Sequence, residues 1–338
     1  MTRIGYRTGL ISDPSRSSWD RSGPRPIAWS AWYPTDAAAS SPRPPALVFA
    51  SGDVAHNASL APGDPFPVAL LSHGTGGTAE SLGWLARALA AAGHVVLGVN
   101  HHGNTGVEAY RPEGFLCWWE RAPDLSTLLT SLDRSGIFAG RLDMTRVAGI
   151  GFSLGGHTVL ALAGARTSFD AFDNWQRSEA EDQTGPREFP NVVDHIPSLL
   201  KGSAPFRAAW ARQSETFADP RITALVAIAP APPVRALSAE TVAAIRLPVM
   251  LLTAGSDTEA PTDHGAAWLC KLNARFRRHN LGDAVGHYTF LDHPADRSLI
   301  GKVDIFTDRR GVDRTRVHTS AADLVRFALT RATDYSSP

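Results

Sequence analysis

Short runs of apolar, β-branched residues alternate with stretches of helical periodicity from about Pro67 onward. This alternation predicts an α/β fold with a mostly parallel central sheet, whose strands are joined by flanking helices. Several of the runs are apolar at every position, which is typical of strands buried on both faces. The predicted strands are Val68–Ser72, His94–Asn100, Val147–Phe152, Ile222–Ile228, Val249–Thr253 and Arg275–Leu281.

Residues 78–93 carry a clear helical pattern, because their leucines and alanines recur on one face. Gly93 ends this predicted helix, since glycine adopts the backbone conformation that often follows a helix. Upstream, the sequence IAWSAWYP at 27–34 alternates in hydrophobicity and closes with proline. It predicts an antiparallel strand at the beginning of the sheet.

Two segments interrupt this alternation of predicted strands and helices. Residues 36–66 are rich in Ala, Ser, Pro and Gly, and they predict a long loop with one extended piece at Leu47–Ala50. Residues 166–220 are acidic, aromatic and contain prolines, and they predict a cap or lid insertion with short helices such as Phe206–Thr216. Because 338 residues suffice for one large α/β domain with an insertion, we predict a single domain over residues 1–338.

The composition excludes several classes of protein. Apolar residues make up 43% and charged residues 20%, as in a folded globule rather than a disordered chain. Lys and Arg together number 33, as do Asp and Glu, so no basic excess suggests nucleic-acid binding. No apolar stretch approaches the ~20 residues that a membrane-spanning helix needs.

Two further features concern the cellular compartment. The residues MTRIGYRTGLISDPSR place polar side chains where a signal peptide would be apolar, so we expect a cytoplasmic protein. Cys117 and Cys270 are the two cysteines, and no CxxC spacing suggests zinc or redox chemistry. We expect unpaired thiols and no cofactor or metal.

The segment RVAGIGFSLGGHTVLALAG carries the most chemical information, because a predicted strand runs into Gly151-Phe-Ser153-Leu-Gly155 and then into an apolar helix. This is a G-x-S-x-G sequence in the strand–turn–helix context of a nucleophile elbow. The glycines permit the close approach of backbone and helix, and the helix amino terminus favours negative charge near the serine oxygen. Ser153 is therefore the candidate nucleophile, and the alternative is a purely structural turn.

A serine hydroxyl needs a base, and the base needs an orienting carboxylate. In hydrolases with such an elbow the acid and then the histidine follow the serine in the chain. Asp257 ends a Gly-Ser-Asp turn directly after the strand Val249–Thr253, which makes it the candidate acid. A turn-forming or helix-capping role is the alternative for Asp257, and Asp263 is the nearest rival.

His287 is the candidate base. It follows the last predicted strand, and the preceding glycine leaves the backbone free to turn the imidazole inward. His279 and His293 are the neighbouring alternatives, both compatible with ordinary structural roles.

The adjacent pair His101 and His102 could suggest a metal site. Neighbouring side chains on an extended segment diverge, however, and no carboxylate motif accompanies the pair. We expect no metal here. His102 is a candidate for the lining of a substrate pocket, and so is Gly76 of the segment 72–77.

Two main-chain N–H groups must stabilise the oxyanion in such an enzyme. One belongs to Leu154, the residue after the nucleophile. The other is expected from the glycine-rich segment SHGTGG at 72–77, where Thr75 is the first candidate and Gly76 the second. A phosphate-binding loop is the alternative, but neither GxGxxG nor GxxxxGK is present.

Taken together, these motifs resemble the dienelactone hydrolase-like branch of the α/β-hydrolases, in particular predicted bacterial dienelactone hydrolases and platelet-activating-factor acetylhydrolases. The resemblance covers most of the chain and rests on several motifs in the expected order. They are Trp32-Tyr-Pro34, SHGTGG at 72–77, Asn100–Asn104, Glu120–Leu125, GFSLGG at 151–156, the Asp257 turn and GHYTFLD at 286–292.

The resemblance implies an α/β-hydrolase with Ser153, His287 and Asp257 as triad and Thr75 and Leu154 as oxyanion donors. Dienelactone hydrolase itself uses a cysteine nucleophile, and position 153 is serine, so the name does not bring the dienelactone substrate with it.

The sequence therefore predicts a metal-independent serine hydrolase that cleaves small or medium acyl esters, lactones or acetylated lipids through an acyl-enzyme. Trp118 and Trp119 are candidates for the wall of an apolar acyl pocket, with a core position as the alternative. Two other functions stay open: an amidase or peptidase on the same triad, and a non-catalytic ligand-binding scaffold. The expected partner is a small-molecule ester or lactone, and the oligomeric state is left open.

Overall fold

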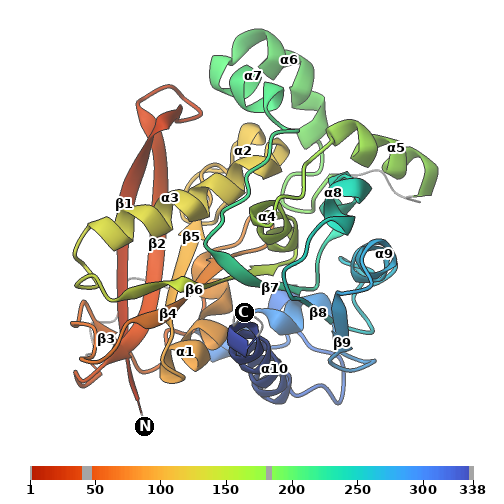
Figure 1. The fold of residues 1–338 in the computed structure, drawn as a ribbon. Coiled ribbons are helices and arrows are strands. Elements are labelled where there is room, and N and C mark those ends of the chain that lie inside the picture. Colours follow the sequence, from red (N-terminus) through yellow and green to blue (C-terminus); the bar gives the residue numbers. More distant parts are fainter. Residues whose placement is uncertain (1, 40–47, 180–184, 335–338) are drawn as a thin grey trace.

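The computed structural model describes residues 2–39, 48–179 and 185–334. Within these ranges the centre of the molecule is a nine-stranded sheet with the order β3-β1-β2-β5-β4-β6-β7-β8-β9 (Figure 1). The strands are β1 Arg3–Ser17, β2 Pro24–Thr35, β3 Ala55–His56, β4 Phe66–Ser72, β5 Val95–Asn100, β6 Leu142–Phe152, β7 Ile222–Ile228, β8 Val249–Thr253 and β9 Arg277–Asn280.

The sheet is parallel from β5 to β9, whereas β1 and β2 form an antiparallel hairpin that joins β5 through β2. The mostly parallel sheet and the antiparallel strand at 27–34 are thus confirmed. Strand β6 begins at Leu142, five residues before the predicted start, because it pairs with Phe66 of β4 across a register shift. Strand β1 was not predicted, because its alternating exposure includes no continuous apolar run.

Helices cover both faces of the sheet (Figure 1). The α-helices are α1 Gly83–Ala91, α2 Pro112–Leu116, α3 Arg121–Arg134, α4 Leu154–Leu162, α5 Phe169–Glu179, α6 Ile196–Gly202, α7 Ala204–Ala211, α8 Ala239–Ala243, α9 Ala266–Leu272 and α10 Arg314–Asp334. Short 3₁₀ turns are η1 Ala79–Leu82, η2 Trp118–Glu120, η3 Val192–His195, η4 Pro232–Ala236, η5 His287–Phe290, η6 Arg297–Leu299 and η7 Asp304–Phe306.

Two of the predicted helices differ in their bounds. Residues 78–93 form η1 followed by α1, and Gly93 ends the run with a φ of +92°. The predicted helix at 206–216 begins at Ala204 because the Ser203 side chain caps it by accepting a hydrogen bond from the N–H of Phe206. It ends at Ala211, earlier than expected.

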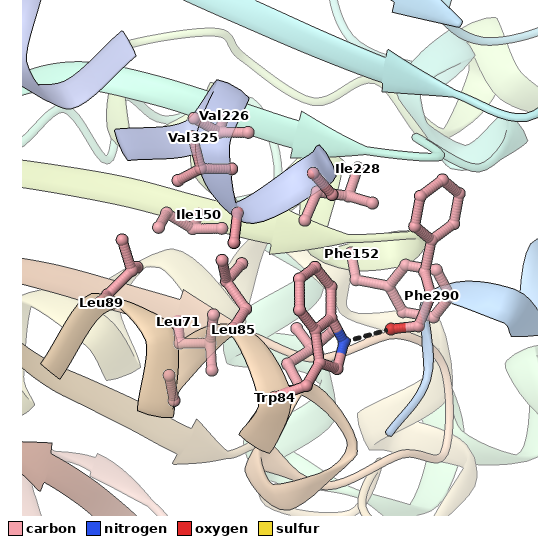
Figure 2. Close-up of a cluster of buried hydrophobic side chains, with 14 of the residues drawn as sticks. Leu71, Trp84, Leu85, Leu89, Ile150, Phe152, Val226, Ile228, Phe290 and Val325 are labelled. Carbon is pink, nitrogen blue, oxygen red and sulfur yellow. Dashed lines mark hydrogen bonds between the residues drawn. The ribbon is translucent and has the colours of Figure 1, made fainter. Parts of the chain in front are cut away.

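The core has one layer on each face of the sheet, because successive residues of the buried strands point to opposite faces. On one face Leu71, Ile150 and Val226 pack against α1 and α10 (Figure 2). On this face the indole N–H of Trp84 donates to the main-chain oxygen of Phe290 at 2.7 Å. Helices α3, α4 and α9 cover the other face. This sandwich holds the carboxyl ends of the parallel strands in fixed positions.

The two irregular segments lie only partly within the described ranges. Residues 40–47 of the predicted loop, including Leu47, and residues 180–184 of the predicted cap lie outside them. In the first segment Phe49 forms an isolated antiparallel bridge with Pro294. In the second, α5, α6 and α7 group beyond one end of the sheet (Figure 1). Of the helices in the described ranges, none has both the length and the apolar character needed to span a bilayer.

Candidate active site

Ser153 lies in the sharp turn between β6 and α4. Its φ of +56° is unusual for a residue with a side chain and raises the hydroxyl beyond the strand end. The turn is fixed by main-chain bonds, because the N–H of Ser153 donates to Ile228 O at 2.8 Å and its carbonyl accepts from Gly156 at 2.9 Å. These bonds to β7 and α4 keep the backbone of Ser153 in this unusual conformation.

Two glycines of this turn are required by close backbone approach. A Cβ on Gly151 would lie 1.9 Å from the carbonyl oxygen of Gly155. A Cβ on Gly155 would lie 2.2 Å from the carbonyl oxygen of Ser72, at the end of β4. Helix α4 can therefore start directly against β4 and β6 only because these positions have no side chain.

The side chains of Ser153, His287 and Asp257 form one hydrogen-bonded series. His287 Nε2 lies 3.0 Å from Ser153 Oγ, and His287 Nδ1 lies 2.8 Å from Asp257 Oδ2. All three residues are buried. The ring of Phe152 lies beside the imidazole, with centroids 4.7 Å apart.

The loops that carry the acid and the histidine are bonded to each other. The N–H of Ser256 donates to Val285 O at 2.9 Å, two residues before His287. The second oxygen of Asp257 accepts from the N–H of Ala260 at 2.7 Å, so the carboxylate is held at both oxygens. The positions of Asp257 and His287 are therefore set together.

The rival residues lie elsewhere. Asp263 is exposed, and His279 is a residue of the edge strand β9. The imidazole of His293 contacts the hydroxyl of Thr315 at 3.1 Å. None of the three is part of the series that includes Ser153.

The segment 72–77 packs directly against the serine. A Cβ on Gly74 would lie 3.1 Å from the Cβ of Ser153. The N–H of Gly76 donates to Asn104 Oδ1 at 2.6 Å. Gly76 was the second candidate for an oxyanion donor, but its N–H is already used in this hydrogen bond. Leu154 is the first residue of α4, and the first N–H groups of a helix have no partner within it.

A buried polar network beneath this segment was missed at the sequence level. Arg121 Nη2 donates a hydrogen bond to the main-chain oxygen of His73. His101 lies between the hydroxyl of Ser72 and the carboxylate of Asp124, at 3.0 Å from each. Burial, aided by the charge of Arg121, lowers the pKa of His101 to about 3, so this imidazole is neutral.

Asp124 joins this network to the amino-terminal hairpin. Its carboxylate accepts from Arg16 at 2.7 Å and from Arg25 at 2.8 Å, and all of these side chains are buried. Burial alone would raise the pKa of Asp124, but the charges of Arg25 and Arg16 hold it well below its ordinary value. The motif at 120–125 was a sequence signal of this network, but its distant partners in β1 and β2 could not be read from it.

A cavity of about 540 Å³ opens at Ser153 and His287. This volume lies within the range of sites for small molecules. Of the predicted pocket residues, Gly76 and Trp118 line the cavity. Further aromatic residues that line the cavity include Phe49, Tyr110, Phe115, Phe169, Phe172, Trp175 and Tyr288.

The other two predicted pocket residues, His102 and Trp119, do not line the cavity. Trp119 is fully buried in a core cluster and donates from its indole N–H to Ala209 O at 2.8 Å. The ring of His102 stacks on that of Trp19. Its Nε2 accepts a hydrogen bond from the main-chain N–H of Trp19, and its Nδ1 contacts the carboxylate of Glu108. For Trp119 the prediction was wrong because the side chains of adjacent residues point in different directions, and only that of Trp118 faces the cavity.

The side chains of His101 and His102 diverge at the end of β5, toward Asp124 and Glu108 respectively. Within the described ranges, no group of three or more His, Cys, Asp or Glu residues is arranged to hold a metal ion. In the same ranges both Cys117 and Cys270 are free thiols.

A ferulic acid esterase from Streptomyces cinnamoneus is similar in structure, with a TM-score of 0.60 over 98% of this chain and 90% of that chain, at 20% sequence identity. The chain has the α/β-hydrolase fold.

A family model adds information from the sequence. Residues 47–113 match the family described as platelet-activating factor acetylhydrolase, isoform II. This range includes the segment 72–77 and Asn100–Asn104 but none of Ser153, Asp257 and His287. No curated protein gives a significant match. The structural neighbour thus supports the fold, and residues 47–113 are similar to the platelet-activating-factor acetylhydrolases.

Proposed function

We propose that this protein hydrolyses carboxylic esters through an acyl-enzyme formed on Ser153, with His287 as general base and Asp257 as the carboxylate that orients it. The observation that supports this most directly is the hydrogen-bonded series of the three side chains at the cavity. A nucleophile within hydrogen-bond distance of a base, which is itself oriented by a third group, is the arrangement that activates a serine hydroxyl.

The reaction proceeds in two halves. His287 Nε2 accepts the proton of Ser153 Oγ as the oxygen attacks the ester carbonyl carbon, and the imidazolium then gives this proton to the departing alcohol. Water enters, loses a proton to His287 and attacks the acyl carbon, after which Ser153 regains its proton and the carboxylic acid leaves. In both halves Asp257 accepts a hydrogen bond from Nδ1–H of His287 and stabilises the imidazolium.

The oxyanion is stabilised by the N–H groups of Leu154 and Thr75 in this proposal. Leu154 begins helix α4, whose amino terminus contributes a positive partial charge at the same place. Thr75 is preferred to Gly76 because the N–H of Gly76 is bonded to Asn104. Loss of one such donor typically costs about 3 kcal/mol of transition-state stabilisation.

The proposed substrates are esters with a small or medium acyl group, lactones or acetylated lipids. The cavity has the volume for them. We also propose that residues 166–220 form a cap of a single domain over 1–338. This is supported by Phe169, Phe172 and Val192, which come from this segment and line the cavity.

A fluorophosphonate probe tests the proposal. We expect covalent labelling of the wild-type protein and none of Ser153→Ala, because only an activated serine reacts. Absence of labelling in both would favour a non-catalytic scaffold. Comparing an ester with its matched amide separates an esterase from an amidase, since the amine leaving group requires stronger protonation.

A further inference from the structure

Four aromatic rings form one wall of the cavity. Trp118 and Phe172 meet edge to face with centroids 4.9 Å apart, and Phe169 lies 5.7 Å from Trp118. Trp175 continues the wall, 5.6 Å from Phe172. All four line the cavity that opens at Ser153, and three of them belong to helix α5.

This wall adjoins the residue that follows the serine. Leu154, the residue after Ser153, belongs to the same apolar cluster as Trp118, Phe172 and Trp175. The leaving group must lie near His287, which protonates it. The neighbours of His287 in the cavity lining, Tyr288 and Leu291, belong to a different core cluster, on the face of α1 and α10.

The polar atoms of the aromatic wall are already engaged within the protein. The indole N–H of Trp118 donates to Phe115 O, and that of Trp175 donates to Glu179 Oε2 at 3.2 Å. Trp118, Phe172 and Trp175 are only 8–9% exposed. Because the indole N–H groups of the two tryptophans are already bonded, a ligand can contact only the apolar surface of these rings.

Trp175 is also held firmly from outside the cavity. The guanidinium of Arg235 lies 5.3 Å from its ring centroid, and the ring of His264 meets it edge to face at 5.4 Å. A wall of fixed rings selects by ring geometry, because aromatic rings attract one another in edge-to-face or offset arrangements beyond the gain from buried area.

We propose that the acyl group of the substrate carries an aromatic ring, which packs against Phe172 and Trp175 when the ester carbonyl is at Ser153. This inference rests on the proposed ester hydrolysis and adds the substrate class: esters of aryl-substituted carboxylic acids. A saturated ring of the same size buries a similar area but has no π-face, so the two differ mainly in their interaction with the wall.

The test compares two methyl esters, methyl 3-phenylpropanoate and methyl 3-cyclohexylpropanoate, by their kcat/KM values. We expect the full-length wild-type protein to prefer the phenyl ester about tenfold. In Phe172→Leu and Trp175→Leu this ratio should fall toward one. Because both esters are measured on the same preparation, a loss of folded protein cancels from the ratio.

Trp268→Leu is the matched control. Trp268 also packs against Arg235, at 5.0 Å from its ring centroid to the guanidinium, but it does not line the cavity. It loses the same side-chain volume as Trp175→Leu, and we expect it to keep the tenfold ratio. A wild-type ratio near one, with p-nitrophenyl acetate still hydrolysed and fluorophosphonate labelling intact, overturns the aromatic acyl group and leaves the proposed function standing.

Two other results also contradict the inference. If Trp268→Leu loses the preference as fully as Trp175→Leu does, the wall is not its source. If the protein hydrolyses no ester and is not labelled, the proposed function and the aromatic acyl group fail together.

Discussion

Arg121 donates a hydrogen bond from Nη2 to the main-chain oxygen of His73, the residue that precedes Gly74 and Thr75 in the segment beside the serine. The guanidinium is buried, and its Nε and Nη1 have no hydrogen-bond partner among the described residues. Burial lowers the pKa of Arg121 to about 9. A buried cation whose hydrogen bonds all go to His73 is well placed to fix the orientation of the peptide groups that follow.

We therefore expect Arg121→Met to lower kcat for a simple ester by about 10- to 100-fold with a smaller change in KM, because a displaced oxyanion donor weakens the transition state more than substrate binding. Steady-state kinetics measure the two constants. Arg212→Met is the control, since Arg212 bonds Glu120 of the same motif but does not contact His73. Equal losses of kcat in both variants would show that the ion network as a whole, rather than the contact with His73, supports activity.

The triad gives a second prediction. Ser153→Ala and His287→Ala should each reduce kcat by roughly 10³-fold or more, because each removes a group that takes part in proton transfer or bond formation. Asp257→Asn should have a somewhat smaller effect, because the imidazole keeps its place but loses its charged partner. Kinetics on p-nitrophenyl esters provide the values.

The rival histidine serves as the control for this series. His293→Gln removes an imidazole that contacts Thr315, outside the series of Ser153 and His287. We expect its kcat to stay close to that of the wild type. If His293→Gln is as inactive as His287→Ala, the assignment of the base is wrong.

The residues that the sequence placed well are those that follow a strand directly. Ser153 and Asp257 each come at or just after the end of a buried strand, and parallel strands end at one edge of the sheet. Local pattern alone is sufficient to place such residues together. His287 follows the edge strand β9 by a short loop, and the glycine before it was a usable signal.

The features that could not be predicted from the sequence depend on contacts between segments that are distant in the chain. Arg16 and Arg25 meet Asp124 across about a hundred residues, and no local pattern pairs them. Trp119 was placed wrongly because its neighbour Trp118 was an equally good candidate, and only packing decides which of two adjacent rings faces a cavity. The sequence also gives no sign that the ring nitrogens of His102 contact Trp19 and Glu108. The aromatic residues of α5 were not predicted to line the site, because a helix that does not pack on the sheet has no sheet to define its inner face.

The nucleophile turn gives a third prediction, about stability. Gly155→Ala should lower the free energy of unfolding by about 2–3 kcal/mol, because the new methyl group would meet the carbonyl oxygen of Ser72 at 2.2 Å and force β4 and α4 apart. Urea titration measures this loss. Activity should fall as well, since the same shift moves Ser153.

Gly202→Ala is the matched control. Gly202 is the last residue of α6, and a Cβ there would meet no atom within 4 Å. We expect its stability to change by less than about 1 kcal/mol, with a gain as the favoured direction, because alanine restricts the unfolded chain. Similar destabilisation in the two variants would mean that contact with Ser72 is not the cause.

The fourth prediction concerns His318, whose burial makes the free energy of unfolding depend on pH. Its ring stacks on Trp84 with centroids 4.1 Å apart, and its Nε2 contacts the carbonyl oxygen of Thr289 at 2.8 Å, in the turn that carries His287. Burial lowers the pKa of His318 to about 3. Between about pH 6.5 and pH 3 the unfolded chain therefore binds a proton at this position and the folded protein does not.

The sign follows from this difference. The stabilisation is fully present above pH 6.5 and is lost as the pH falls, at up to about 1.4 kcal/mol per pH unit for one histidine. In His318→Gln, whose amide can still donate to Thr289 O, the slope of unfolding free energy against pH should decrease by about that amount between pH 4 and 6. Urea titrations at several pH values measure the slope. His195→Gln, which replaces a partly exposed histidine of η3, is the control. An unchanged slope in His318→Gln would show that this imidazole is already protonated in the folded protein over the same range.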